Sequence, residues 1–284
     1  MKFTKLQGLG NDFVLIDARE APGEDWPGLS NKICERRFGV GSDGLLLLLD
    51  SRSADFHMRM FNPDGSEAEA CGNGLRCLLR YIEEKGLNVR DSLLIETKAG
   101  VRQAKLVRQG GKVALIRVSM GKPSFEPGSI PVAAEPGRGK KLDIMLGDYP
   151  LRIEDRELHL NFVSMGNPHA VFFIPGPVAE FPLTQVGPKV EKNVLFPRGV
   201  NFEIVQVTGP GKCSMRVWER GAGETLACGS GACAVAVAAK LKGLAGDSLE
   251  ITLPGGTAQV GWDGIGEVWL TGPAEIVFTG EWPG

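Results

Sequence analysis

The chain has 284 residues, which is long for one domain and enough for two. Hydrophobic residues make up 43% and charged residues 23%, as in an ordinary globular protein, and the net charge of -2 gives no basic surplus for nucleic acid. No apolar run approaches the roughly 18 residues of a membrane span, the first residues show no signal peptide, and six cysteines without an export signal indicate a reducing compartment. We therefore expect a cytoplasmic protein that binds neither nucleic acid nor membrane.

Short strands dominate the first part of the chain. Their apolar or alternating runs are bounded by turn-forming residues. We expect strands at residues 13–16, 45–49, 92–97, 101–107 and 113–119.

The helix of this first part is expected to begin after Cys71. Leu75, Leu78, Leu79 and Ile82 follow at the spacing i, i+3, i+4 and i+7, which places them on one face of a helix. Gly86 follows as a residue that can end it in the left-handed conformation.

The second part of the chain repeats this order. Strands are expected at residues 170–174 and 204–207, and a second helix after Cys228 that ends at Gly243. Alanine and valine occupy nearly every side of this second helix, so we expect it to be almost wholly buried.

Matched positions indicate an internal duplication. Cys71-Gly72-Asn73-Gly74 and Cys228-Gly229-Ser230-Gly231 lie 157 positions apart, and Gly10-Asn11 and Gly166-Asn167 lie 156 apart. We expect an α+β fold of two pseudo-symmetric domains, each a curled, mostly antiparallel sheet around a central helix. The domains are predicted at residues 1–122 with the C-terminal strand 273–284, and at residues 123–272.

Two cysteines at helix starts suggest acid/base chemistry. A helix N-terminus offers unpaired N–H groups and a partial positive charge, which favours a thiolate and can bind a carboxylate. If one sulfur is a thiolate and the other a thiol, the first can take a proton from one face of a carbon while the second delivers one to the other face. The result is racemisation or epimerisation without a cofactor, and no cofactor motif is visible.

Other interpretations of the six cysteines remain open. Cys34, Cys77, Cys213 and Cys233 lack matched partners and are expected to pack in the core. A metal site is not expected, because the chain has no Cys-x-x-Cys and only three histidines. A non-catalytic protein with a Cys71–Cys228 redox switch is a further alternative.

Several strings resemble the diaminopimelate epimerase family over essentially the whole chain. They are Gly8-Leu9-Gly10-Asn11-Asp12-Phe13, Phe61-Asn62-Pro63-Asp64-Gly65, Ala70-Cys71-Gly72-Asn73-Gly74, Met165-Gly166-Asn167-Pro168-His169, Gly199-Val200-Asn201, Glu219-Arg220-Gly221-Ala222-Gly223-Glu224 and Ala227-Cys228-Gly229-Ser230-Gly231. Proline and hydroxyproline racemases share the duplicated fold, and one of these is the alternative activity.

The resemblance implies residue roles by position. Cys71 and Cys228 would be the acid/base pair, with His169 and Glu219 tuning their protonation. Gly72, Asn73, Gly229 and Ser230 would hold the reacting carboxylate. The distal end of the substrate would be held by Asn11, Asn62, Asn167, Asn201 and Arg220, with Glu219 also available to an ammonium group.

The resemblance also implies the reaction and its setting. It implies interconversion of the LL and meso forms of 2,6-diaminopimelate without pyridoxal phosphate, in lysine and peptidoglycan precursor synthesis. It also implies a homodimer that acts on a small-molecule amino-acid substrate. It implies neither a metal nor a cofactor.

Overall fold

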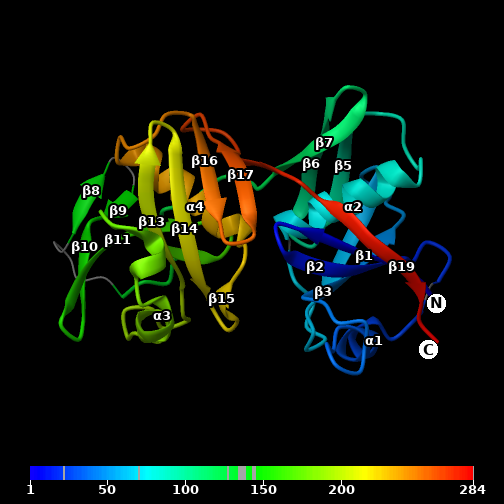
Figure 1. The fold of residues 1–284 in the computed structure, drawn as a ribbon, viewed down its shortest axis with the longest axis horizontal. Coiled ribbons are helices and arrows are strands. Elements are labelled where there is room, and N and C mark those ends of the chain that lie inside the picture. Colours follow the sequence, from blue (N-terminus) through cyan, green and yellow to red (C-terminus); the bar gives the residue numbers. More distant parts are fainter. Residues whose placement is uncertain (22, 70, 127, 134–138, 143–144, 284) are drawn as a thin grey trace. The chain divides into compact units, whose positions relative to one another are not determined.

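A computed structural model describes residues 1–21, 23–69, 71–126, 128–133, 139–142 and 145–283. Ala70 of the first cysteine string and residues 134–138, from the Pro/Gly-rich stretch between the two repeats, lie outside the described residues. The chain divides into two compact units, Met1–Ser119 with Thr271–Gly284 (unit 1) and Met120–Leu270 (unit 2). Each unit is built of strands around one long helix (Figure 1).

Unit 1 is a sheet curled around helix α2. Its elements are β1 (Lys2–Gly8), β2 (Asn11–Asp17), α1 (Trp26–Ile33), β3 (Gly44–Leu49), β4 (Phe56–Phe61), α2 (Gly72–Glu84), β5 (Ser92–Thr97), β6 (Gly100–Gln109), β7 (Lys112–Ser119) and β19 (Glu275–Glu281). The strands pair in the order β19–β1–β2–β3–β4–β5–β6–β7, with parallel pairs only at β2–β3 and β4–β5.

Unit 2 repeats this plan around helix α4. Its elements are β8 (Lys140–Leu142), β9 (Met145–Gly147), β10 (Tyr149–Ile153), β11 (Arg156–Ser164), β12 (Pro168–Phe173), η1 (Val178–Glu180), α3 (Leu183–Glu191), β13 (Asn201–Gly209), β14 (Lys212–Glu219), β15 (Gly223–Thr225), α4 (Gly229–Leu241), β16 (Ser248–Leu253) and β17 (Gly256–Gly261), followed by β18 (Trp269–Gly272). The order β10–β11–β12–β13–β14–β16–β17 has parallel pairs at β12–β13 and β14–β16.

The two pairing schemes confirm the predicted duplication. In each unit an antiparallel pair leads to a parallel pair, with a helix between its two strands, and a second parallel pair flanks the long helix. Helices α2 and α4 both have 13 residues and both start directly after their cysteine. The predicted α+β class, with mostly antiparallel sheets, is therefore confirmed.

The helix ends follow from local chemistry. Gly86 and Gly243 come two residues after the last helical residue and adopt positive φ angles of 62° and 72°, which a residue without a Cβ tolerates best. In α4 every residue from Gly231 to Ala239 is buried, as its alanine-rich sequence predicts. In α2 the buried positions include the apolar face expected from the sequence.

The two units have separate hydrophobic cores. Leu45, Leu46, Leu47 and Leu48 of β3 are all completely buried in unit 1, on both faces of the strand. Unit 2 has an aromatic core in which the rings of Phe162 and Phe196 lie edge to face at 5.7 Å. Among the helices of the described residues, none has both the length and the apolar character that a membrane crossing requires.

Candidate active site

Each long helix is capped by its cysteine. Cys71 and Cys228 have extended backbone conformations, and the sulfur of each accepts a hydrogen bond at 3.4 Å from the backbone N–H three residues on, at Gly74 and Gly231. A side chain that caps a helix in this way sits against the positive end of the helix dipole. Both sulfurs therefore lie at the start of a long helix, where an anion can bind.

The first cysteine cluster, in unit 1, comprises Cys71, Asn73 and Asn11. The Asn73 side-chain amide donates to Asn11 Oδ1 at 3.0 Å, and the Asn11 amide donates to Asp43 Oδ2 at 2.7 Å. Asn73 Oδ1 accepts at 2.8 Å from Arg76, whose side chain is fully buried. These bonds fix the directions of both amides beside the start of α2.

The second cysteine cluster, in unit 2, surrounds Cys228 with two carboxyl groups. Burial raises the pKa of the Cys228 thiol well above its ordinary value, and the negative charges of Glu219 and Glu203 raise it further. Burial also raises the pKa of Glu219, whose carboxyl group is hydrogen-bonded to Thr225 and to Cys228. These surroundings favour the thiol form of Cys228 over its thiolate.

A chain of hydrogen bonds runs through the same cluster. His169 Nδ1 lies 2.6 Å from Glu203 Oε1, and His169 Nε2 lies 2.9 Å from Asn167 Oδ1. The Asn167 amide then donates to Ser230 Oγ at 3.2 Å, and Ser230 Oγ lies 3.5 Å from Cys228 Sγ. The structure thus brings four of the predicted residues of unit 2 into contact.

Asn201 and Arg220 lie beside each other but use their polar atoms within the protein. Asn201 is buried, donates to the Pro168 carbonyl at 3.0 Å and accepts from the Arg220 backbone N–H at 2.9 Å. The Arg220 guanidinium is bonded to the Arg198 carbonyl at 3.2 Å, and the residue is exposed. Arg220 therefore keeps donors free to turn toward a carboxylate, whereas Asn201 holds the backbone that carries it.

The remaining predicted residues lie at the ends of the same elements. Gly72 and Gly229 are the first residues of α2 and α4, where the absence of side chains leaves backbone N–H groups open to an anion. Asn62 follows β4, and its amide donates to Ser66 Oγ at 2.9 Å within a turn.

Sequence reasoning missed several residues that support these clusters. Glu203 and Arg76 are fully buried charged residues, and Asp43 orients Asn11. A charged residue within the apolar strand Asn201–Gly209 was a usable signal for Glu203. No comparable signal marked Asp43, because its bond to Asn11 spans 32 positions.

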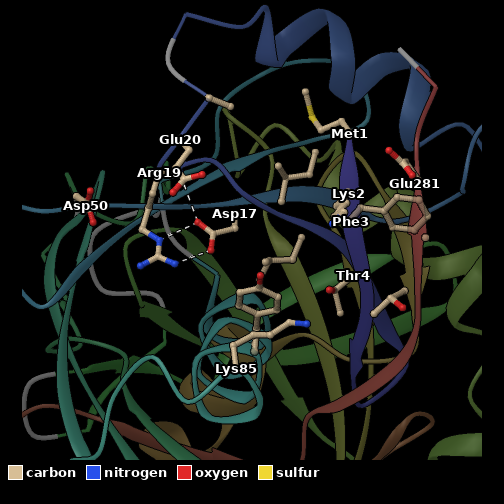
Figure 2. Close-up of a pocket in the computed structure, with 16 residues that line it drawn as sticks. Met1, Lys2, Phe3, Thr4, Asp17, Arg19, Glu20, Asp50, Lys85 and Glu281 are labelled. Atoms are coloured by element: carbon tan, nitrogen blue, oxygen red, sulfur yellow. Dashed lines mark hydrogen bonds and ion pairs between the residues drawn. The ribbon is translucent and has the colours of Figure 1, made fainter.

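A cavity in unit 1 lies apart from the first cysteine cluster. It has a volume of about 870 Å³, and Tyr81, Lys85, Arg19, Asp17, Lys2 and Thr4 are among the residues that line it. Arg19 donates to Asp17 Oδ2 at 2.7 Å. Figure 2 shows this pair among the residues that line the cavity. None of the predicted site residues lines it.

The sequence comparisons agree on one family. The family model described as diaminopimelate epimerase matches residues 3–126 and 161–277. Proteins named diaminopimelate epimerase from Pelotomaculum thermopropionicum and Moorella thermoacetica are each 48% identical to this chain, over 100% of its length and 99% of their own. One from Methanococcus maripaludis is 44% identical over 99% of both chains.

Solved structures of distant sequence share the fold. A hydroxyproline epimerase from Agrobacterium vitis has 16% identity and a TM-score of 0.70, covering 99% of this chain and 91% of that one. A probable proline racemase from Agrobacterium radiobacter has 16% identity and a TM-score of 0.71, covering 99% and 92%. A PhzF-family phenazine biosynthesis protein from Bacillus anthracis has 19% identity and a TM-score of 0.70, covering 99% and 98%.

Proposed function

This chain belongs to the diaminopimelate epimerase family and is an isomerase, and we propose that it interconverts LL- and meso-2,6-diaminopimelate with Cys71 and Cys228 as its two acid/base groups. The observation that carries the proposal is the duplicated cysteine cap. Each sulfur accepts the N–H of a glycine at the start of a 13-residue helix.

The two proton transfers balance between the cysteines. The thiolate of one cysteine takes the proton from the α-carbon, and its sulfur becomes a thiol. The thiol of the other cysteine then donates its proton to the opposite face of the same carbon and becomes a thiolate. The stereocentre inverts, one thiol and one thiolate remain, and the reverse reaction uses the same groups in exchanged roles.

The surroundings of Cys228 support one assignment of the starting charge state. Burial and the neighbouring carboxylates of Glu219 and Glu203 raise its pKa, so Cys228 begins as the proton donor. Cys71, at the start of α2, is then the group that begins as the base. In the reverse direction Cys228 must lose its proton, and binding a substrate ammonium near Glu219 would ease that loss by supplying a positive charge.

The substrate carboxylate next to the reacting carbon has suitable donors in both cysteine clusters. Gly72 and Asn73 at the start of α2, and Gly229 and Ser230 at the start of α4, offer N–H groups at the positive ends of the helix dipoles. These donors stabilise the negative charge that develops as the α-proton leaves. Because stabilised charge and two thiols account for the reaction, the proposal assigns no pyridoxal phosphate or other cofactor.

The distal end of the substrate carries an ammonium group and a carboxylate. Asparagine amides can donate to its carboxylate and accept from its ammonium group without adding net charge. Arg220 supplies a guanidinium that can bind the distal carboxylate through two parallel hydrogen bonds. We assign Asn11, Asn62, Asn167 and Arg220 to this end, with Asn201 supporting it by holding the Arg220 backbone and Glu219 available to an ammonium.

Two assays test the activity and separate it from the alternatives. The protein is incubated with LL-diaminopimelate, L-proline and trans-4-hydroxy-L-proline, and the stereoisomers are separated by chiral chromatography. We expect turnover of diaminopimelate only, and loss of turnover in Cys71→Ala and Cys228→Ala. Turnover of a proline alone would favour the other two-thiol racemases. Absence of turnover of every substrate by the reduced, folded protein would favour the non-catalytic protein with a Cys71–Cys228 redox switch.

We also propose a cytoplasmic homodimer that supplies lysine and peptidoglycan precursors. The C-terminal strand β19 pairs with β1 and leaves Val277 57% and Phe278 47% exposed, although both are large apolar residues. Burying this strand against a second copy would remove them from water. Light scattering of Phe278→Glu should give a monomer where the parent protein gives a dimer, and a dimer in both would reject this surface.

A further inference from the structure

One buried pair breaks the repeat between the two units. In unit 2, His169 of β12 and Glu203 of β13 are in contact and fully buried. Phe13 of β2 lies at the matching position in unit 1, 156 residues before His169, and it too is fully buried.

Strand register identifies the counterpart of Glu203. In unit 1 Phe13 pairs with Gly44, and in unit 2 His169 pairs with Asn201. Two positions after Gly44 stands Leu46, and two positions after Asn201 stands Glu203, so Leu46 is the counterpart of Glu203.

The glycines at the helix starts give the same match. A Cβ on Gly74 would lie 3.0 Å from Leu46, and a Cβ on Gly231 would lie 2.9 Å from Glu203 Oε1. Two independent geometries therefore assign Phe13 and Leu46 as the counterparts of His169 and Glu203.

The fold itself does not require this polar pair. Unit 1 fills the same place with a phenylalanine and a leucine, and a buried ion pair stabilises a fold no better than apolar residues of similar volume in many proteins. Moreover, Glu203 Oε2 is buried and has no hydrogen-bond partner among the described residues, which costs stability. The His169–Glu203 pair is therefore not explained by fold stability, and we look for its role in the chemistry at Cys228.

Its bonds lead directly to a proposed catalytic group. The His169 ring bridges Glu203 Oε1 and Asn167 Oδ1, with its Nδ1 at 2.6 Å from the first oxygen and its Nε2 at 2.9 Å from the second. With its oxygen engaged, Asn167 can only turn its NH2 group toward Ser230 Oγ, 3.2 Å away. Ser230 in turn lies 3.5 Å from the Cys228 sulfur.

We propose that Glu203 is a positioning residue for epimerisation, which acts through His169 and Asn167 to fix the Ser230 hydroxyl beside the Cys228 thiol. This inference rests on the proposed role of Cys228 and adds a residue to it. Glu203 does not touch the substrate. It sets the direction of a row of hydrogen bonds that ends at the sulfur and at the first turn of α4.

The charge of Glu203 also acts on the groups around it. The titratable groups in this cluster are His169 on β12, Glu203 on β13, Glu219 on β14 and Cys228 before α4. The Glu203 charge adds to burial in raising the pKa of the Cys228 thiol and of Glu219. Removing that charge lowers both pKa values, so Cys228 loses its proton at a lower pH.

The test compares Glu203→Gln and Glu203→Leu with the parent protein. Glutamine keeps the shape and an acceptor for His169 but removes the charge, and leucine is the residue found at the same place in unit 1. For Glu203→Gln we expect kcat to fall about tenfold with KM changed little, as for residues that orient a reactive group through another. The basic limb of the kcat/KM profile should move about one pH unit toward lower pH.

Two further variants make the result decisive. Glu250→Gln removes a carboxylate that pairs with Lys212 at 2.9 Å on the surface of unit 2, and its pH profile should match that of the parent. The double variant His169→Phe with Glu203→Leu reproduces the unit 1 pair, so it should fold with a Tm close to the parent's while epimerisation is lost. A folded Glu203→Leu should lose more activity than Glu203→Gln.

The inference and the proposed function fail in different ways. An unshifted pH profile with near-parental kcat in Glu203→Gln overturns the role of Glu203, even if Cys228→Ala is inactive. A fully active Cys228→Ala overturns the two-cysteine proposal itself. If Glu203→Leu does not fold, the Glu203→Gln profile still decides the inference.

Discussion

Arg76 offers a sharp test of how the first cysteine cluster is held in place. Its fully buried guanidinium donates to Asn73 Oδ1 at 2.8 Å, to the Pro273 carbonyl at 3.2 Å and to the Gly72 carbonyl at 3.4 Å. Arg76→Met keeps the unbranched apolar chain and removes all of these donors.

The size of the effect follows from what the substitution leaves behind. Two well-formed acceptors, Asn73 Oδ1 and the Pro273 carbonyl, lose a buried charged donor, at about 1–3 kcal/mol each. We expect the free energy of unfolding to fall by about 4 kcal/mol, equivalent to a Tm lower by about 10 °C. Since Asn73 also donates to Asn11, we expect kcat/KM to fall about tenfold as both amides lose their fixed directions.

Urea unfolding followed by circular dichroism, together with epimerisation kinetics, measures both effects. Arg80→Met is the matched control one turn further along α2. Arg80 also donates to two carbonyls, of Ala274 and Val113, but its surroundings are only partly buried, so water replaces the lost donors. Its kcat/KM should stay at the parent level. An Arg76→Met protein within about 1 kcal/mol of the parent and with unchanged kcat/KM would refute the reasoning.

Two further predictions concern packing at α4 and the acid limit of stability. Gly231→Ala places a Cβ 2.9 Å from Glu203 Oε1 and 3.3 Å from the Cys228 sulfur. In Gly74→Ala the nearest atom to the new Cβ is a leucine methyl at 3.0 Å, so kcat should fall more in Gly231→Ala than in Gly74→Ala. Equal losses of kcat in the two variants would contradict this expectation. Although burial raises the pKa of Asp12, hydrogen bonds from Arg36 and Lys5 outweigh it and leave the pKa below its ordinary value. Asp12 therefore stabilises the fold above about pH 4, and this contribution is lost as the pH falls through its folded pKa. The stability difference between the parent and Asp12→Asn should be larger at pH 7 than at pH 3, and a difference independent of pH would exclude this role.

Much of the framework could be predicted because the sequence repeats itself. The matched Cys-Gly-x-Gly strings located both helix starts, and the apolar spacing and following glycines located the helix ends. Some strand predictions matched closely, such as residues 92–97 for β5 (Ser92–Thr97), whereas others were right in kind but short. For example, residues 204–207 were expected, and β13 covers Asn201–Gly209. The strand begins at a polar residue, Asn201, and ends at Thr208 and Gly209, which do not stand out as strand in an apolar pattern.

The shorter helices and the support of the cysteine clusters could not be predicted in this way. Helix α3 contains Pro188 and Gly187, residues that normally argue against a helix. Gly187 is required by packing, because a Cβ there would come within 2.6 Å of the Trp218 ring, a contact that local sequence does not reveal. Glu203 and Asp43 act through partners 34 and 32 positions away, and no local pattern gives such pairings. The predicted substrate contacts stay predictions.

The central claim is that two sulfurs act on opposite faces of one carbon. The most direct measurement is proton NMR and mass analysis of LL-diaminopimelate turned over by the reduced protein in D2O, stopped at low conversion. The account predicts that the meso product carries one deuterium at the inverted carbon while the recovered LL substrate carries almost none. Meso product that retains the original proton would contradict it, because that outcome requires a single base that returns the proton it removed.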